Sequence, residues 1–183
     1  KTCHKIGVDI FNDITALKEK NKTIFISKTA SPIIIMHMQK EPINMQINPK
    51  YSFAPIDIYK FFSKKIIDLT EAGVKKSNIV VDPGIGFGKT LSDNLNLLKY
   101  LPLFHALGVP ILIGASRKSL IAELTIHDYK LRGKNKKKII PSKRLSGSLA
   151  FAIHANMCGV QILRTHDVFE TNQALICQKS LHL

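Results

Sequence analysis

The sequence predicts an α/β protein with a parallel sheet and a functional site at the carboxyl ends of its strands. Short apolar runs alternate along the chain with segments of helical periodicity, which is typical of repeated βα units. Polar or charged residues directly follow these runs, and parallel α/β folds bind ligands where their strands end. A parallel barrel and an open sheet both fit this pattern.

The composition is that of one globular domain. The chain has 183 residues, 45% of them hydrophobic, which is enough for a single core, so we expect residues 1–183 to form one domain. No apolar run approaches the roughly 20 residues of a membrane span, and a cytoplasmic location with no membrane partner is expected. The three cysteines are odd in number and lack metal spacing, which favours free thiols. They are Cys3, Cys158 and Cys177.

Two strands are predicted near the start of the chain. Residues 8–13 indicate a short strand ending at Asn12, and residues 33–37 a second, buried strand. The polar loop 39–51 is too long for a tight connection, which suggests a functional role.

A long helix is predicted from Pro55 to a glycine C-cap at Gly73. Its apolar residues recur at three- and four-residue spacing, as on the buried face of a helix. They are Ile58, Phe61, Phe62, Ile66 and Leu69.

The stretch 79–90 is the most informative of the chain. Three β-branched residues run directly into Asp82, which predicts a buried strand with a carboxylate at its end. The glycine-rich turn that follows is not a Walker loop, because Pro83 stands where the first glycine should be before Gly88-Lys89-Thr90. Nor does Gly-x-Gly-x-Gly match the dinucleotide motif. A turn without function remains the alternative.

An anion site is predicted after the next strand. A helix is predicted between residues 92 and 108, with Ser92 as its candidate N-cap and Pro102 interrupting it. Residues 111–114 are then predicted to form the next strand. Ser116 is the expected N-cap of the following helix, which places residues 117–119 in its first turn. Basic residues there oppose the helix dipole by about 0.3–1 kcal/mol each, so an anion bound at the helix start would explain them.

A second anion site is predicted near the C-terminus. Residues 160–163 form the last strand, and Arg164 and His166 follow it, before a segment at 167–170 that has capping-box form. The helix expected at 145–158 carries small residues suited to close packing on a sheet. They are Ala150, Ala152 and Ala155.

The net charge of +14 is concentrated in one segment, 130–144. Like charges repel, so a solvated loop is the main interpretation. Nucleic acid is not an expected partner, because no aromatic residues interleave with these lysines to stack on bases.

Taken together, six motifs resemble those of the dihydropteroate synthase family, the sulfonamide targets of folate biosynthesis. They are Phe11-Asn12-Asp13, Met36-His37-Met38-Gln39, the run from Asp82 to Lys89, Ser116-Arg117-Lys118-Ser119, Arg144-Leu145-Ser146-Gly147-Ser148, and Arg164-Thr165-His166-Asp167. The resemblance implies a (β/α)8 TIM barrel and a transferase. Its reaction would join 4-aminobenzoate to (7,8-dihydropterin-6-yl)methyl diphosphate, releasing diphosphate.

The resemblance also implies a role for each site residue, none of them a general acid or base. Pterin would be bound by Asn12, Met36, Asp82 and Lys118. Diphosphate would be bound by Arg164, Thr165 and His166, and aminobenzoate by Phe87, Lys118 and Ser119. Family members use Mg²⁺ on the diphosphate, and its protein ligand is expected outside this chain.

A complete barrel needs about 250 residues, and this chain supplies about five βα units, so the first three are expected to be missing. We therefore expect a fragment, a split gene product or a decaying gene product that is inactive alone. The missing units would be on a separate chain or lost, and a homodimer is a further expectation. A pterin-binding methyltransferase is an alternative that the motifs at 116–119 and 164–167 disfavour. A non-catalytic remnant that binds RNA would be supported by the charge alone.

Overall fold

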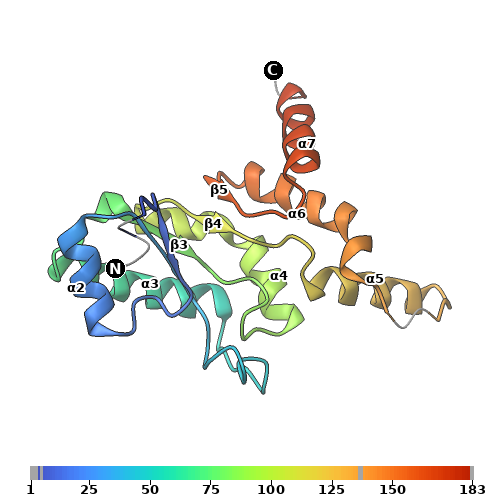
Figure 1. The fold of residues 1–183 in the computed structure, drawn as a ribbon. Helices are drawn as coiled ribbons and strands as arrows, with labels where there is room; N and C mark the ends of the chain where they lie inside the picture. Colours follow the sequence, from blue (N-terminus) through green and yellow to red (C-terminus); the bar gives the residue numbers. More distant parts are fainter. Residues whose placement is uncertain (1–3, 5, 136–137, 182–183) are drawn as a thin grey trace.

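The structure is a computed structural model that describes residues 4, 6–135 and 138–181 (Figure 1). Its strands are β1 (Phe11–Asp13), β2 (Ile33–Met36), β3 (Ile79–Asp82), β4 (Leu112–Ile113) and β5 (Ile162–Leu163). Its helices are α2 (Lys20–Thr29), α3 (Ala54–Glu71), α4 (Leu91–Lys99), α5 (Ser119–Leu131), α6 (Leu145–Met157) and α7 (Val168–Ser180). Short 3-10 helices occupy Lys76–Asn78, Leu101–Leu107 and Pro141–Lys143.

The strands are parallel and lie side by side in the order of the sequence. β1, β2 and β3 form one hydrogen-bonded sheet, and β4 pairs with β5. A bridge between Val81 and Ile111 joins the two groups, and the Val81 N–H donates to the Pro110 carbonyl at 3.0 Å. A doubly wound sheet reverses its strand order at the ligand site, whereas the wall of a barrel does not. The order therefore favours the barrel.

The two faces of the strands differ in how they are covered. On the outer face, Ile33, Ile35, Ile79 and Val81 are at most 1% exposed. They belong to the main core, which also contains Ile58, Phe62, Leu97 and Phe104 from the helical layer. The inner face has a smaller cluster, Ile34, Val80 and Leu112 with Ile162 beside it. Because side chains alternate along a strand, Met36 and Asp82 continue this inner face.

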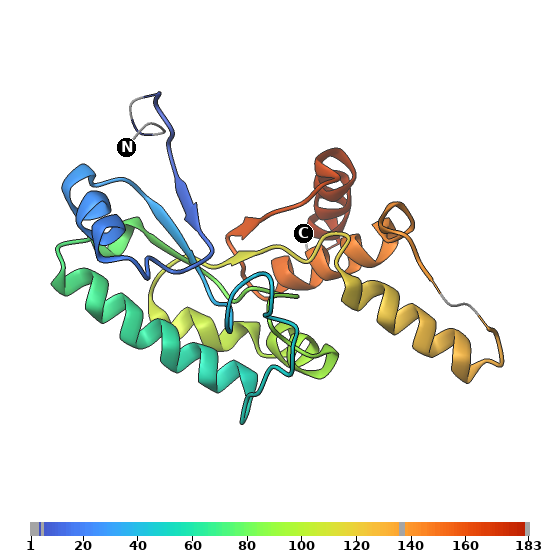
Figure 2. The same ribbon diagram turned by 60° about the horizontal axis from the view of Figure 1, so that its bottom comes forward.

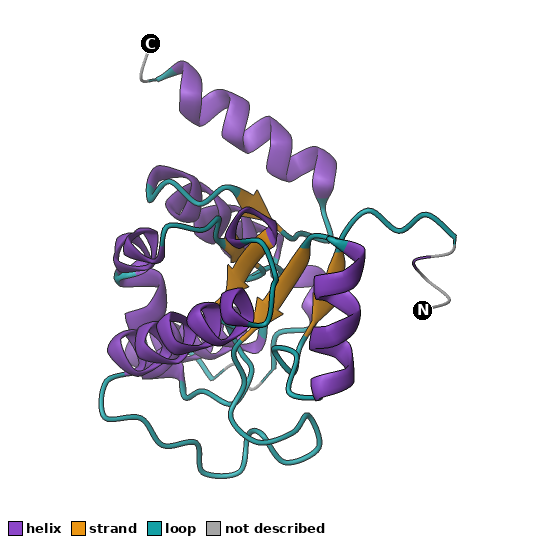
Figure 3. Ribbon diagram, turned by 90° about the vertical axis from the view of Figure 1, so that its left-hand side faces the viewer, coloured by secondary structure: helices purple, strands orange, loops and turns teal. Residues whose placement is uncertain are grey.

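The helices lie outside the strands (Figures 2 and 3). In Figure 2, α3 runs along one side of the strands, and α6 lies near α7 at the opposite end of the molecule. The C-terminal helix α7 projects away from the strands in Figure 1. No helix in the described part of the chain is long and apolar enough to cross a membrane.

The long helix α3 forms as predicted. Pro55 lies in its first turn, and the Asp57 carboxylate accepts hydrogen bonds from the backbone N–H groups of Ser52 at 2.8 Å and Phe53 at 3.2 Å. Of its predicted apolar face, Phe61 is the exception, since its side chain is partly exposed and its ring lies 4.9 Å from the His37 ring. Gly73 follows the helix at a φ of +88°, a conformation that glycine adopts at low cost.

The strand predicted at 8–13 is shorter than expected. β1 begins at Phe11 and includes Asp13, while Val8 and Ile10 are exposed. Among the described residues β1 pairs only with β2, so no strand there covers its other edge beside Val8 and Ile10.

The predicted N-caps at Ser92 and Ser116 were both wrong. Thr90 caps α4: its hydroxyl accepts the Asp93 N–H at 3.2 Å, and the Asp93 carboxylate accepts the Thr90 N–H at 3.0 Å. α5 begins at Ser119 after Lys118, and the Ser116 hydroxyl instead contacts His166. Residues 117 and 118 thus precede the helix rather than lying in its first turn.

The predicted capping box at Asp167 and the predicted packing of α6 also need correction. Asp167 is the N-cap of α7 but makes no side-chain cap, because its carboxylate pairs with Arg117. On α6, Ala150 is exposed, and the close contact occurs at Gly147, where a Cβ would collide with the side chain of Ile121. The small residue that packs fully is Ala155.

Candidate functional site

Asp82 lies at the carboxyl end of β3, beside Met36 of β2. Its side chain is buried, and Oδ1 accepts the Gly84 N–H at 2.8 Å. Its carbonyl accepts the His37 N–H at 2.9 Å, so the strand pairing continues up to the carboxylate. A Cβ on Gly84 would collide with the His37 carbonyl, which explains why a glycine follows at this point.

Three cations act electrostatically on the Asp82 carboxylate. Burial raises the pKa of Asp82 overall, and the Gly84 N–H and the charges of Lys118, Lys89 and Arg164 partly offset this rise. A buried carboxylate is stable only where hydrogen bonds and opposite charges replace water. These interactions favour the ionised form of Asp82, which can accept hydrogen bonds from a ligand.

The structure brings together Lys118 and Phe87, two residues to which the resemblance assigns aminobenzoate binding. The Lys118 Nζ lies 3.9 Å from the centroid of the Phe87 ring and donates to the Ile85 carbonyl at 2.9 Å. Burial lowers the pKa of Lys118 to about 8, which Asp82 opposes and Arg164 reinforces. This ammonium therefore links the glycine turn to the start of α5.

Asn12 and Met36 do not line the same cleft. Met36 lines a cleft of about 840 Å³ between the loop after β1, the loop after β2 and α3, whereas Asn12 lines a cleft of about 360 Å³ beside α2. Asn12 pairs with Ile34, so it lies two residues before the level of Met36 along the strands.

A barrel tilt would bring these levels to one rim. The bridge of Val81 to Ile111 makes Asp82 level with Leu112 and hence with Ile162, so Arg164 lies two residues beyond Asp82. Asn12 lies two residues before it. An offset of two residues along a strand is about 6.6 Å, and two strand spacings across the sheet are about 9.6 Å. This ratio corresponds to a strand tilt of about 35°. Strands in a (β/α)8 barrel tilt by about 36°, so Asn12, Asp82 and Arg164 would share one height.

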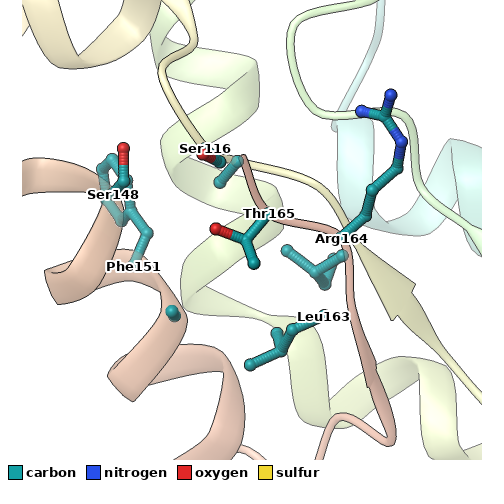
Figure 4. A pocket seen from close by; sticks show the side chains of 9 residues that line it. Ser116, Ser148, Phe151, Leu163, Arg164 and Thr165 are labelled. Carbon is teal, nitrogen blue, oxygen red and sulfur yellow. The ribbon is translucent and has the colours of Figure 1, made fainter. Parts of the chain in front are cut away.

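The predicted diphosphate residues follow β5 (Figure 4). Arg164 is exposed, and its side chain points away from the small pocket that Ser116, Ser148 and Thr165 line in the figure. The Thr165 hydroxyl faces this pocket, lies 3.0 Å from the Thr171 hydroxyl and accepts the Asp167 N–H at 3.2 Å. Its side chain thus supports the loop rather than facing Arg164.

His166 is held by Ser116. The Ser116 hydroxyl accepts the His166 N–H at 3.2 Å and lies 3.0 Å from Nδ1. The other ring nitrogen is on the opposite edge of the ring, where an exposed His166 can meet a ligand. The serine predicted as a helix cap is therefore a support for the histidine.

Ser119, the first residue of α5, lines a polar cleft of about 400 Å³. The cleft lies below the glycine turn, between α4, α5 and the loop after β2. Its other lining residues are Gln46, Pro49, Gly86, Lys89, Thr90, Leu91, Asn94 and Glu123. The loop is attached to the turn, because the Gln46 amide donates to the Gly86 carbonyl at 2.6 Å and the Tyr51 hydroxyl to the Gly88 carbonyl at 2.9 Å.

Two groups near the site make contacts that were not predicted from the sequence. Lys89 is 4% exposed and donates to the carbonyls of His37 at 3.2 Å and Phe87 at 2.8 Å. Arg117 pairs with Asp167, donating from Nε at 3.0 Å. The position of Lys89 inside a glycine-rich turn is the sequence signal that marks this residue.

The described residues do not fit a metal ion held by this chain. Within residues 4, 6–135 and 138–181 no three His, Cys, Asp or Glu side chains cluster so that they could hold a metal. The Asp82 carboxylate instead has ammonium and guanidinium groups as its neighbours, which would repel a divalent cation.

Comparison with known proteins shows that this chain is similar to dihydropteroate synthases. Residues 1–166 match the family described as "Pterin binding enzyme". The dihydropteroate synthase of Escherichia coli K12 is 41% identical over 171 residues, 93% of this chain and 56% of its own length. That of Neisseria meningitidis serogroup C is 39% identical over 178 residues, 96% and 59%. The chain thus spans a little over half the length of these relatives.

Solved structures of dihydropteroate synthases are also similar to this chain. The Yersinia pestis synthase in complex with a sulfonamide drug has a TM-score of 0.85 and 37% identity, covering 97% of this chain and 60% of that one. The Xanthomonas albilineans synthase in complex with 7,8-dihydropteroate has a TM-score of 0.83 and 31% identity, covering 99% and 64%.

Proposed function

This chain belongs to the pterin-binding enzyme family and has its TIM-barrel type of α/β fold, and we propose that it is a substrate-binding part of a dihydropteroate synthase. In the proposed reaction the amine nitrogen of 4-aminobenzoate attacks the methylene carbon of (7,8-dihydropterin-6-yl)methyl diphosphate. A C–N bond forms, the C–O bond to diphosphate breaks, and the amine loses one proton. The protein's task is to align the two reactants and to stabilise the departing charge.

One observation carries the proposal: the buried Asp82 carboxylate at the end of β3, with Lys118 held above Phe87 beside it. A pterin ring presents several N–H donors on one edge, which an ionised carboxylate accepts as charge-assisted bonds worth about 1.5–3 kcal/mol each. Met36, level with Asp82, supplies an apolar surface for the ring. In a closed barrel, the strand tilt would bring Asn12 to the same rim.

Aminobenzoate is assigned to the neighbouring groups. Phe87 offers a ring face, and Ser119 lies at the first turn of α5, where free N–H groups favour a carboxylate. Lys118 lies between this region and Asp82, so its ammonium is placed to contact both substrates.

Arg164 and His166 are assigned to the diphosphate. Both are exposed after β5, and Ser116 orients the imidazole. Thr165 is assigned through its backbone, because its hydroxyl faces the other way (Figure 4). Mg²⁺, when bound to the diphosphate, would offset its negative charge, and we assign none of the described residues to it.

The named relatives support the same reaction. The Xanthomonas albilineans synthase has been solved with 4-aminobenzoic acid and with 7,8-dihydropteroate. At 31–32% identity, a shared pair of substrates is the simplest proposal for this chain. We further propose that the protein forms a homodimer and is cytoplasmic. A separate chain would carry the three remaining βα units.

Diphosphate release tests it. The chain would be assayed with both substrates and Mg²⁺, alone and mixed with a polypeptide that supplies the three remaining βα units. We expect release in the mixture, dependent on both substrates, and none from the chain alone. A folded mixture that releases no diphosphate would contradict the synthase.

The same mixture distinguishes the two alternatives. Methyl transfer from a methylated pterin without aminobenzoate would favour the methyltransferase. RNA binding that falls steeply with salt and is lost when the lysines from Lys134 to Lys138 are neutralised would favour the RNA-binding remnant.

A further inference from the structure

Lys89 is a buried ammonium with a full set of partners. Its Nζ donates to the Phe87 carbonyl at 2.8 Å and the His37 carbonyl at 3.2 Å, and lies 3.2 Å from His37 Nδ1. The Tyr51 ring centroid is 6.0 Å away. With 4% of the residue exposed, the ammonium faces the protein rather than a ligand, so it does not bind phosphate as a Walker lysine would.

The ammonium connects two segments that shape the site. His37 directly follows β2, and its N–H already donates to the Asp82 carbonyl. Phe87 belongs to the glycine turn after β3. Lys89 therefore fastens the turn to the end of β2, whereas Lys118 lies over Phe87 and bonds the Ile85 carbonyl.

Burying this charge is costly for the fold. Desolvation lowers the pKa of Lys89 to about 7, while the charges of Asp82 and Asp93 act in the opposite direction and that of Lys118 adds to it. A Met or Leu of similar volume would avoid this cost. The charge is thus better explained by what it does to Asp82 than by core packing.

We propose that Lys89 is a positioning residue of the site: its hydrogen bonds to the His37 and Phe87 carbonyls fix the glycine turn to the end of β2, and its charge favours the carboxylate form of Asp82. This inference rests on the proposed function for its substrates, but both of its effects belong to the protein itself. They are measurable without turnover.

The first test is the titration of Asp82 by ¹³C NMR of its carboxyl group in the full chain. Lys89→Met keeps the aliphatic stem and removes the charge, and Lys60→Met, at an exposed position of α3, is the matched control. We expect Lys89→Met to raise the Asp82 pKa by about one or more and Lys60→Met to leave it unchanged. An unchanged Asp82 pKa in folded Lys89→Met would overturn the electrostatic role.

The second test is hydrogen exchange of the backbone amides at 84–88. Loss of the Lys89 bonds should speed exchange there at least about tenfold relative to the amides of α3, with no change in Lys60→Met. Equal protection in both variants would overturn the fastening role.

Affinity for 6-hydroxymethylpterin adds a functional readout. We expect Lys89→Met to weaken it at least about tenfold, and Lys89→Arg to restore part of it. If the unsubstituted chain does not bind this pterin, even with the remaining βα units, the proposed function fails while the titration still decides the role of Lys89. Should Lys89→Met not fold, the reciprocal experiment applies: Asp82→Asn should lower the Lys89 pKa further, and no change would contradict the coupling.

Discussion

The guanidinium of Arg117 pairs with the Asp167 carboxylate and so joins the loop before α5 to the loop before α7. The Arg117 backbone is fixed as well, because its N–H donates to the Ser148 hydroxyl at 2.9 Å and its carbonyl accepts from Arg144 at 2.8 Å. Its φ of +56° lies in the left-handed region, which is unfavourable for a side chain of this size. The Arg117–Asp167 pair thus stabilises the turn that places Lys118 in the site.

A double-mutant cycle tests this connection. Arg117→Met and Asp167→Asn should each lower the free energy of unfolding, and the double variant should lose less than the sum, because either change alone breaks the same pair. Arg117 lowers the pKa of Asp167, so the contribution of the pair is present above the ordinary carboxyl pKa and is lost on acidification. Additive effects in urea denaturation at neutral pH would contradict the pairing.

Asp82→Asn should weaken binding of 6-hydroxymethylpterin while the fold remains. Replacing one charged acceptor costs about 1.5–3 kcal/mol, which corresponds to about 10- to 150-fold in affinity. Calorimetric titration measures the affinity, and circular dichroism checks the fold. Asp68→Asn, at an exposed position of α3, is the control and should change neither. Unchanged affinity in Asp82→Asn would remove this residue from the site.

Two glycines with nearly equal φ allow close approach to be separated from backbone conformation. Gly84 has a φ of +71° and Gly133 a φ of +70°. A Cβ on Gly84 would collide with the His37 carbonyl, whereas one on Gly133 has nothing within 4 Å. Gly133→Ala should cost about 1–2 kcal/mol for the left-handed backbone, and Gly84→Ala at least about 1 kcal/mol more. Equal losses in urea denaturation would mean that the turn relaxes away from β2.

His37 should make the fold sensitive to acid. Burial and the neighbouring Lys89 lower its pKa to about 3 from an ordinary value of 6.5. Between these values the unfolded chain binds a proton that the folded chain does not, so the free energy of unfolding should fall by about 1.4 kcal/mol per pH unit as pH decreases.

The acid effect is measured by urea denaturation at intervals from pH 7 to pH 4. His37→Gln should show a shallower decrease, and His127→Gln, at an exposed position of α5, should keep the original one. If both variants follow the unsubstituted chain, His37 does not carry this dependence.

Local patterns in the sequence were sufficient for several elements. The apolar runs of β2 and β3 and the helical spacing of α3 indicate their burial directly, since a continuous apolar run or a regular stripe is stable only against a core. Gly73 marks a helix end because its backbone conformation favours glycine. The motif order was enough to indicate the family.

The helix caps at Ser92, Ser116 and Asp167 could not be predicted in the same way. A hydroxyl or carboxylate near a helix start has a local use as a cap and a remote use as a tertiary partner, and both look alike in sequence. Ser116 bonds His166, and Asp167 pairs with Arg117, in each case across two loops. Whether such a side chain caps its helix depends on whether a remote partner lies within reach, and only the fold determines that.

The sequence by itself determined that a carboxylate follows a buried strand and that basic residues follow two others, because these are properties of consecutive residues. Only the tertiary structure decided which of them meet. Parallel pairing sets Asp82 beside Met36, and the turn of Arg117 brings Lys118 over Phe87. It also buried Lys89 beneath the glycine turn rather than exposing it to a phosphate. The physical reason is that charge interactions depend on distance and burial, neither of which a linear pattern contains.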